Sequence, residues 1–100
     1  MEYTLNWSDR SLANLKSIES YIAEDSPFQA KKVVNEIIDY AENLKTFPKM
    51  GRILPDFPYL GFRQIIKYSY RIIYSFDGNI VTVIAVVHGR QKYITRYLHD

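Results

Sequence analysis

"FRQIIKYSYRIIYSFDGNIVTVIAVVH", residues 62–88, decides the fold of this chain. It contains three runs rich in β-branched and aromatic residues, a composition typical of strands. The tripeptide DGN between the second and third runs is a strong hairpin signal, and a short turn near Tyr68 separates the first two. The stretch therefore predicts three consecutive antiparallel strands that form a meander.

The residues before this meander predict one short strand and two helices. Apolar and polar residues alternate over residues 3–7, as in a half-buried strand, and apolar residues recur at helical spacing over about residues 9–24. A second helix is expected from an N-cap at Ser26 to a stop before Pro48. Residues 48–61 hold three of the four prolines and are expected to form a structured loop. The predicted order is β-α-α-β-β-β, an α+β layer in which a helical hairpin covers one face of an antiparallel sheet and the other face stays open.

Length and composition limit the classes of function. A chain of 100 residues with 47% hydrophobic residues is expected to form a single domain, over residues 1–100. The absence of cysteine excludes disulfides, thiolate zinc sites and a cysteine nucleophile. Two histidines and scattered acids give no zinc-type spacing, so no metal or cofactor is expected. No signal peptide or membrane-spanning segment is recognisable, which predicts a cytoplasmic protein without membrane contact.

Charge is distributed unevenly. Residues 51–100 hold seven Lys and Arg against three Asp and Glu, whereas residues 1–50 hold six against eight. Pairing across DGN is expected to bring Arg71 close to Ile84 and to place Arg63 nearby on the same open face. His88 ends the last strand of this basic and aromatic patch, and the residues that follow continue it: Arg90, Lys92, Tyr93, Arg96 and Tyr97. Such a patch suits phosphates and bases or an acidic protein partner, although a strand arginine or a strand-end histidine is more often structural.

Two further expectations concern this face. Ile65, Ile73 and Ile84 are expected to be exposed on it, so that a bound partner would stabilise the chain. Gly89 is expected to let the backbone leave the sheet at an angle.

Several motifs together resemble the RelE/ParE superfamily of bacterial toxins from toxin–antitoxin pairs. They are "FPKMGRILPDF", "FRQIIKYSYRIIYSF" and "VTVIAVVHGRQ", with "YRIIY" and "HGR" as the most specific marks, and "LANLKSIESYIAEDSPFQAKKVV" is similar to the family's helical hairpin. The resemblance covers nearly the whole chain. It implies the fold predicted above and a cognate antitoxin that wraps over the sheet and helices in a hetero-oligomer.

The resemblance includes two mechanisms, of which the first is cleavage of mRNA on the ribosome by RelE-like toxins. In this interpretation the catalytic candidates are Arg63, Arg71, His88, Arg90 and Tyr93. Arg71 and Arg90 would stabilise charge on the phosphate, and Tyr93 or His88 would move protons. RelE itself has a lysine pair before the "YR" strand, where only Arg63 is basic here, and its tyrosine lies three residues farther along than Tyr93.

ParE-like members instead resemble inhibitors of DNA gyrase without chemistry of their own. Their last strand runs into His-x-Arg and a tail containing Thr-Arg, which is similar to "HGRQKYITRYL" here and favours the ParE branch. This interpretation implies a target-binding segment that comprises His88, Arg90, Lys92, Tyr93, Arg96 and Tyr97. A non-toxic interaction protein of the same fold is the third alternative.

Overall fold

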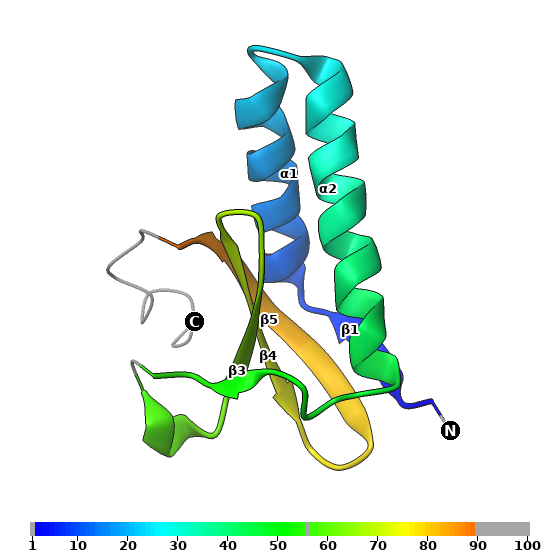
Figure 1. The fold of residues 1–100 in the computed structure, drawn as a ribbon, viewed down its shortest axis with the longest axis vertical. Helices are drawn as coiled ribbons and strands as arrows, with labels where there is room; N and C mark the ends of the chain where they lie inside the picture. The colour runs from blue at the N-terminus through cyan, green and yellow to red at the C-terminus, as the bar shows by residue number, and fades with distance from the viewer. Residues whose placement is uncertain (1, 56, 90–100) are drawn as a thin grey trace.

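The computed structural model describes residues 2–55 and 57–89, in which two helices stand beside a five-stranded sheet (Figure 1). The helical layer comprises α1 (Asp9–Ala23), α2 (Pro27–Ala41) and the short 3₁₀ helix η1 (Glu42–Lys45). The strands are β1 (Thr4–Trp7), β2 (Arg52–Ile53), β3 (Arg63–Lys67), β4 (Tyr70–Phe76) and β5 (Ile80–His88), and the 3₁₀ helix η2 (Pro58–Leu60) precedes β3. The architecture confirms the predicted α+β class with its helical hairpin.

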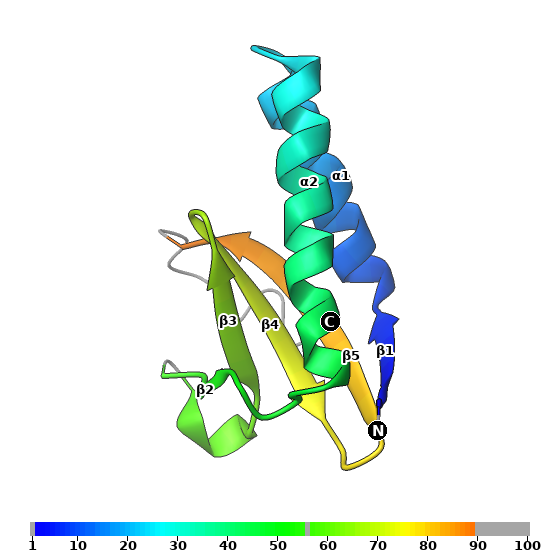
Figure 2. The ribbon, with the colours of Figure 1, turned by 45° about the vertical axis from the view of Figure 1, so that its right-hand side comes forward.

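The strand order in the sheet is β1-β5-β4-β3-β2 (Figure 2). The meander of β3, β4 and β5 has the predicted antiparallel pairing, whereas β1 lies parallel to β5, with Thr4 opposite Ile80. β2 corrects the prediction that residues 48–61 are only a loop, because Arg52 and Ile53 pair with β3. Two residues are too few to show the alternation that identifies a strand.

Both helices begin after a serine cap, and the cap at Ser26 was predicted. The Ser8 side chain accepts from the Ser11 N–H at the start of α1, and Ser26 accepts from the Gln29 N–H at the start of α2. Ser8 also donates to the Ile84 carbonyl at 2.9 Å. Farther along α1, the Asn14 side chain accepts from the Val86 N–H at 3.0 Å. These contacts anchor α1 to β5 beyond the point where β1 ends.

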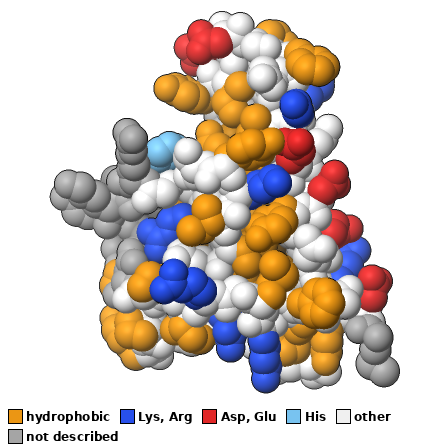
Figure 3. Space-filling model, viewed as in Figure 1, with side chains coloured by type: hydrophobic (Ala, Val, Ile, Leu, Met, Phe, Trp, Pro, Cys, Tyr) orange, Lys and Arg blue, Asp and Glu red, His pale blue; other side chains and the backbone are white. Residues whose placement is uncertain are grey.

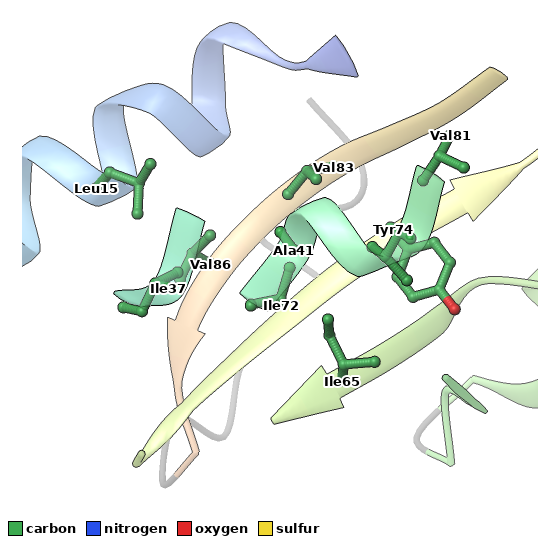
Figure 4. Close-up of a cluster of buried hydrophobic side chains, with 10 residues drawn as sticks. Leu15, Ile37, Ala41, Ile65, Ile72, Tyr74, Val81, Val83 and Val86 are labelled. Carbon is green, nitrogen blue, oxygen red and sulfur yellow. The ribbon is translucent and has the colours of Figure 1, made fainter. Parts of the chain in front are cut away.

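Apolar side chains pack on both faces of the sheet. Leu15 and Ile37 from the helices meet Ile65 and Ile72 from the sheet in the main core (Figure 4). A smaller cluster on the opposite face joins Leu54 to residues of β4 and β5: Ile73, Ala85 and Val87, with Phe57 and Phe62 packed against them. The second face is therefore partly covered by the segment between β2 and β3.

This covering corrects the expectation that Ile65 and Ile73 are exposed. Ile65 is 5% exposed because strand alternation directs it toward the helices, and Ile73 is 0% exposed because it lies in the smaller cluster. Ile84 is half-buried against that same cluster. The apolar side chain of β3 that remains exposed on the second face is Ile66, at 56%.

A buried tyrosine fixes the segment that leads into β2. The Tyr74 side chain is fully buried, and its hydroxyl donates to the Pro48 carbonyl at 2.8 Å and accepts from the Gly51 N–H at 2.9 Å. A Cβ on Gly51 would lie 2.5 Å from the Tyr74 hydroxyl and 2.7 Å from the Gln64 carbonyl oxygen. Only glycine allows this close approach without displacement of the sheet or the loop.

The helices in the described part of the chain include none that is long and apolar enough to cross a membrane.

Candidate functional site

A shallow hollow lies where the β3–β4 turn meets the end of β5. It encloses about 430 Å³ and is lined by Pro55, Gln64, Ile66, Ser69, Arg71, His88 and Gly89. Its two cationic or titratable side chains, Arg71 and His88, are both candidates from the sequence. The strands therefore bring together two residues that are 17 positions apart, although His88 pairs with Tyr70 and not with Arg71, which pairs with Val87.

Arg71 is held on the second face by a neighbouring strand. Its Nε donates to the Gln64 side-chain oxygen at 2.6 Å, and Gln64 itself is only 8% exposed. In the sheet Arg71 pairs with Ile66 on one side and with Val87 on the other. The pairing nearest the turn, Phe76 with Val81, would already put Val86 opposite Arg71, and the register shift between Ile73 and Tyr74 moves this by one residue to Val87, so the expected neighbour Ile84 is not opposite Arg71.

His88 is the last residue of β5 and lies exposed opposite Tyr70. The two rings are arranged edge to face, with their centroids 5.7 Å apart. Burial, with a smaller contribution from Tyr21, raises the pKa of the Tyr70 hydroxyl above its usual value of 10.0. His88 also borders a second hollow, of about 410 Å³, between α1 and the end of β5. His88 therefore lies at the edge of the sheet, where it borders both hollows.

Gly89 follows the last residue of β5 and is still hydrogen-bonded to the neighbouring hairpin. Its N–H donates to the Ser69 carbonyl at 2.6 Å, which extends the pairing between β5 and the β3–β4 turn by one residue. A Cβ at this position would lie 3.1 Å from the same carbonyl oxygen. The small size of Gly89 permits this close contact with Ser69, and the expected departure of the backbone from the sheet after Gly89 lies outside the described residues.

Arg63 does not join Arg71, which corrects the prediction that they are neighbours on one face. Arg63 has the same parity on β3 as the core residue Ile65, whereas Arg71 has the parity of Ile73 on β4. The Arg63 guanidinium donates to the Gly51 carbonyl at 2.8 Å and reaches the Lys49 carbonyl at 3.4 Å. These contacts give Arg63 a structural position beside the loop into β2.

The tip of the β3–β4 hairpin contains two residues that the sequence did not identify as candidates. Lys67 places its ammonium 5.3 Å from the centre of the Tyr68 ring and 5.4 Å from the centre of the Tyr40 ring on α2. Tyr68 has a φ of 56°, in the left-handed region. The residue run KYSY has no glycine or asparagine that would have indicated such a turn.

The remaining candidates lie outside the described residues: Arg90, Lys92, Tyr93, Arg96 and Tyr97. Within the described ranges, no group of three or more His, Asp or Glu could hold a metal ion. Figure 3 shows Lys and Arg side chains gathered over the sheet, with the acidic side chains along the helical layer. The hollow can thus offer positive charge and hydrogen bonds to an anionic or acidic partner.

Comparison with known proteins identifies the family. The sequence model described as "ParE toxin of type II toxin-antitoxin system, parDE" matches residues 5–93. A search of curated proteins finds no significant match. The fold is similar to three solved structures, each at or below 20% identity.

One is a chromosomal ParDE toxin–antitoxin system from P. aeruginosa, with 19% identity, a TM-score of 0.71, and coverage of 87% of this chain and 96% of that one. The second is the toxin–antitoxin complex RelBE2 from Mycobacterium tuberculosis, with 19% identity, a TM-score of 0.65, and coverage of 88% and 99%. The third is a mutant of the E. coli toxin RelE in the free state, with 20% identity, a TM-score of 0.67, and coverage of 97% and 94%. Because the family model matches nearly the whole sequence, this chain belongs to the ParE toxin family of type II toxin–antitoxin systems, within the RelE/ParE superfamily.

Proposed function

We propose that this protein arrests bacterial growth by inhibiting DNA gyrase in the cytoplasm, and that a cognate antitoxin neutralises it in a hetero-oligomer. The observation that carries the proposal is the ParE family match over residues 5–93, which includes the "HGRQKY" segment that favoured ParE in the sequence. The similar ParDE and RelBE2 structures are a toxin–antitoxin system and a toxin–antitoxin complex, which supports an antitoxin partner here.

The arrangement of the described cations also favours inhibition by binding over RNA cleavage. Cleavage requires several preorganised donors around one phosphate together with groups that move protons. Arg63 is turned to the Gly51 carbonyl on the other face, and Lys67 lies against the Tyr40 ring. Among the described residues, the hollow retains Arg71 and His88 as its cationic or titratable groups.

RNA cleavage is the second candidate function, because these two residues share the hollow. Arg71 is oriented by Gln64, and His88 lines the same hollow. With Arg90 and Tyr93 they would form a phosphate site and a proton-transfer group. A non-toxic binding protein of the same fold is the outcome if growth is unaffected.

The decisive experiment induces the protein in bacterial cells and measures growth, then tests the purified protein separately for gyrase supercoiling and for translation-dependent mRNA cleavage. We expect growth arrest and loss of supercoiling with intact mRNA. Cleavage of mRNA with normal supercoiling would instead establish the second candidate. Restoration of growth by the co-expressed antitoxin tests the partner.

Tyr93→Phe separates the two mechanisms within one assay. A gyrase inhibitor retains the apolar ring and should keep nearly full toxicity, whereas an endonuclease that uses the hydroxyl should lose about 10²-fold or more in cleavage rate. Arg90→Ala should remove toxicity in either case, since both mechanisms assign that side chain a polar or anionic contact. Lys32→Ala, an exposed cation on α2, is the matched control and should remain toxic.

A further inference from the structure

We propose that Tyr68, at the tip of the β3–β4 hairpin, is a contact residue for the protein target, and that with Lys67 it receives an acidic side chain flanked by apolar surface. This inference deepens the proposed function and rests on it for the identity of the target as gyrase. It starts from three observations on the described residues: a backbone outlier, a stack of two rings on a cation, and a link between the hairpin tip and the end of β5.

The backbone outlier shows that folding alone does not favour tyrosine at this position. Among the described residues other than glycine, Tyr68 alone has a positive φ, at 56°. Lys67 pairs directly with Tyr70, so the loop contains two residues and Tyr68 is the first. Glycine or asparagine adopts this conformation more easily, and a bulky side chain here is a genuine outlier. A tyrosine therefore makes the hairpin harder to form, and its ring is explained better by an external contact.

The rings around Lys67 produce a preorganised cationic site. The Lys67 ammonium lies over both Tyr40 and Tyr68, and no ion pair involves it within the described part of the chain. The Tyr68 side chain is 53% exposed. Among the described residues from β2 to the end of β5 the single acid is Asp77, at the other hairpin turn, and no ion pair joins Lys67 to Glu36 or Asp39 of α2. Lys67 can therefore receive an acidic group from outside the chain, and an apolar neighbour of that group would contact the exposed Tyr68 ring.

The hairpin tip is linked to the proposed target-binding segment. Ser69 follows Tyr68 directly, and its carbonyl accepts the 2.6 Å hydrogen bond from the Gly89 N–H. The ribbon places this turn beside the end of β5 and away from η2, in both orientations (Figures 1 and 2). A partner that reaches His88 and the residues after it would therefore also meet Tyr68. A protein fits better than RNA, because an RNA footprint draws on many separate phosphate contacts, whereas this tip offers one stacked ammonium with apolar neighbours.

The experiment compares Tyr68→Asn and Tyr68→Gly with Tyr59→Asn, which changes another tyrosine, 80% exposed, on η2. Each variant is tested by urea unfolding, by growth on induction and by inhibition of purified gyrase. We expect both Tyr68 variants to unfold at the same or higher urea concentration than the wild type, yet to need at least tenfold more protein for gyrase inhibition and to lose growth arrest. Tyr59→Asn should retain both activities. Lys67→Met, which keeps an apolar side chain of similar length without the charge, should weaken inhibition as well.

The outcomes distinguish this inference from the proposed function. Tyr68 variants as toxic as the wild type would overturn the inference while leaving gyrase inhibition intact. A wild-type protein that arrests growth without affecting supercoiling would overturn the proposed function, and loss of mRNA cleavage in the Tyr68 variants would then identify RNA as the occupant. Weaker antitoxin binding with unchanged toxicity would assign the tip to the antitoxin and overturn a target contact. A wild-type chain without effect on growth would overturn both.

Discussion

Tyr74→Phe tests the hydrogen bonds that hold the segment before β2 against the sheet. The substitution removes only the hydroxyl, and it leaves a buried Gly51 N–H and a buried Pro48 carbonyl without their partner. A buried polar group that loses its hydrogen bond costs about 1–3 kcal/mol. Lys49 and Met50 between the two groups are exposed, so water can partly replace the lost hydroxyl. We therefore expect a loss of about 2 kcal/mol.

For a domain of this size, such a loss corresponds to a fall in Tm of about 8–16 °C. Thermal and urea unfolding of the two proteins, followed by circular dichroism, measure it. Tyr59→Phe is the control, since that side chain is 80% exposed; it should change stability by less than about 0.5 kcal/mol. If Tyr74→Phe unfolds at the wild-type urea concentration, the two hydrogen bonds do not hold this segment.

Three further changes probe the same scaffold. Burial raises the pKa of the Tyr74 hydroxyl above 10.0, and the Gly51 hydrogen bond opposes this with a smaller effect. The contribution of the neutral hydroxyl to the free energy of unfolding should therefore be fully present below pH 10. It should be lost as the pH rises from 10 through the folded-state pKa. Urea unfolding from pH 8 to 11 should show this decline, and a shallower one in Tyr74→Phe; a flat profile would contradict it. Gly51→Ala should destabilise more than Tyr74→Phe, because its Cβ would meet the Tyr74 hydroxyl and the Gln64 carbonyl; equal or greater stability in urea would refute the close packing. Asn14→Ala should cost about 1 kcal/mol by freeing the Val86 N–H, and hydrogen exchange at that amide should accelerate.

The parts of the fold that the sequence predicted correctly depend on local signals. The serine cap at Ser26, the apolar stripes of the helices and the DGN hairpin are each contained within a few neighbouring residues, and the structure confirms them. β2 was missed because a two-residue strand has no period of its own and forms only by pairing with β3. The shift in pairing between Ile73 and Tyr74 leaves Ile84 as an extra residue on β5, and the pattern along one strand does not reveal it.

The same distinction applies to the candidate site. Arg71 and His88 meet at one hollow because the start of β4 lies beside the end of β5, a relation that an antiparallel hairpin implies. The placement of Arg63 was wrong because neighbouring residues of a strand point to opposite faces, and an error of one residue in pairing reverses the face. Tyr68 and Lys67 were missed as partners because their contact with Tyr40 joins a hairpin to a helix far away in the sequence.

The parallel pairing of β1 with β5 has a consequence for synthesis of the protein. Thr4 pairs with Ile80, and Trp7 with Val83, so the first strand to be made finds its neighbour only among the last strands. Translation at about 5–20 residues per second separates the two by roughly 4–15 s. During that interval Leu5 and Trp7 have no strand beside them, and contacts so distant in sequence slow folding after release as well. A nascent chain therefore cannot complete the sheet that carries His88, and activity should appear only after translation has passed the end of β5.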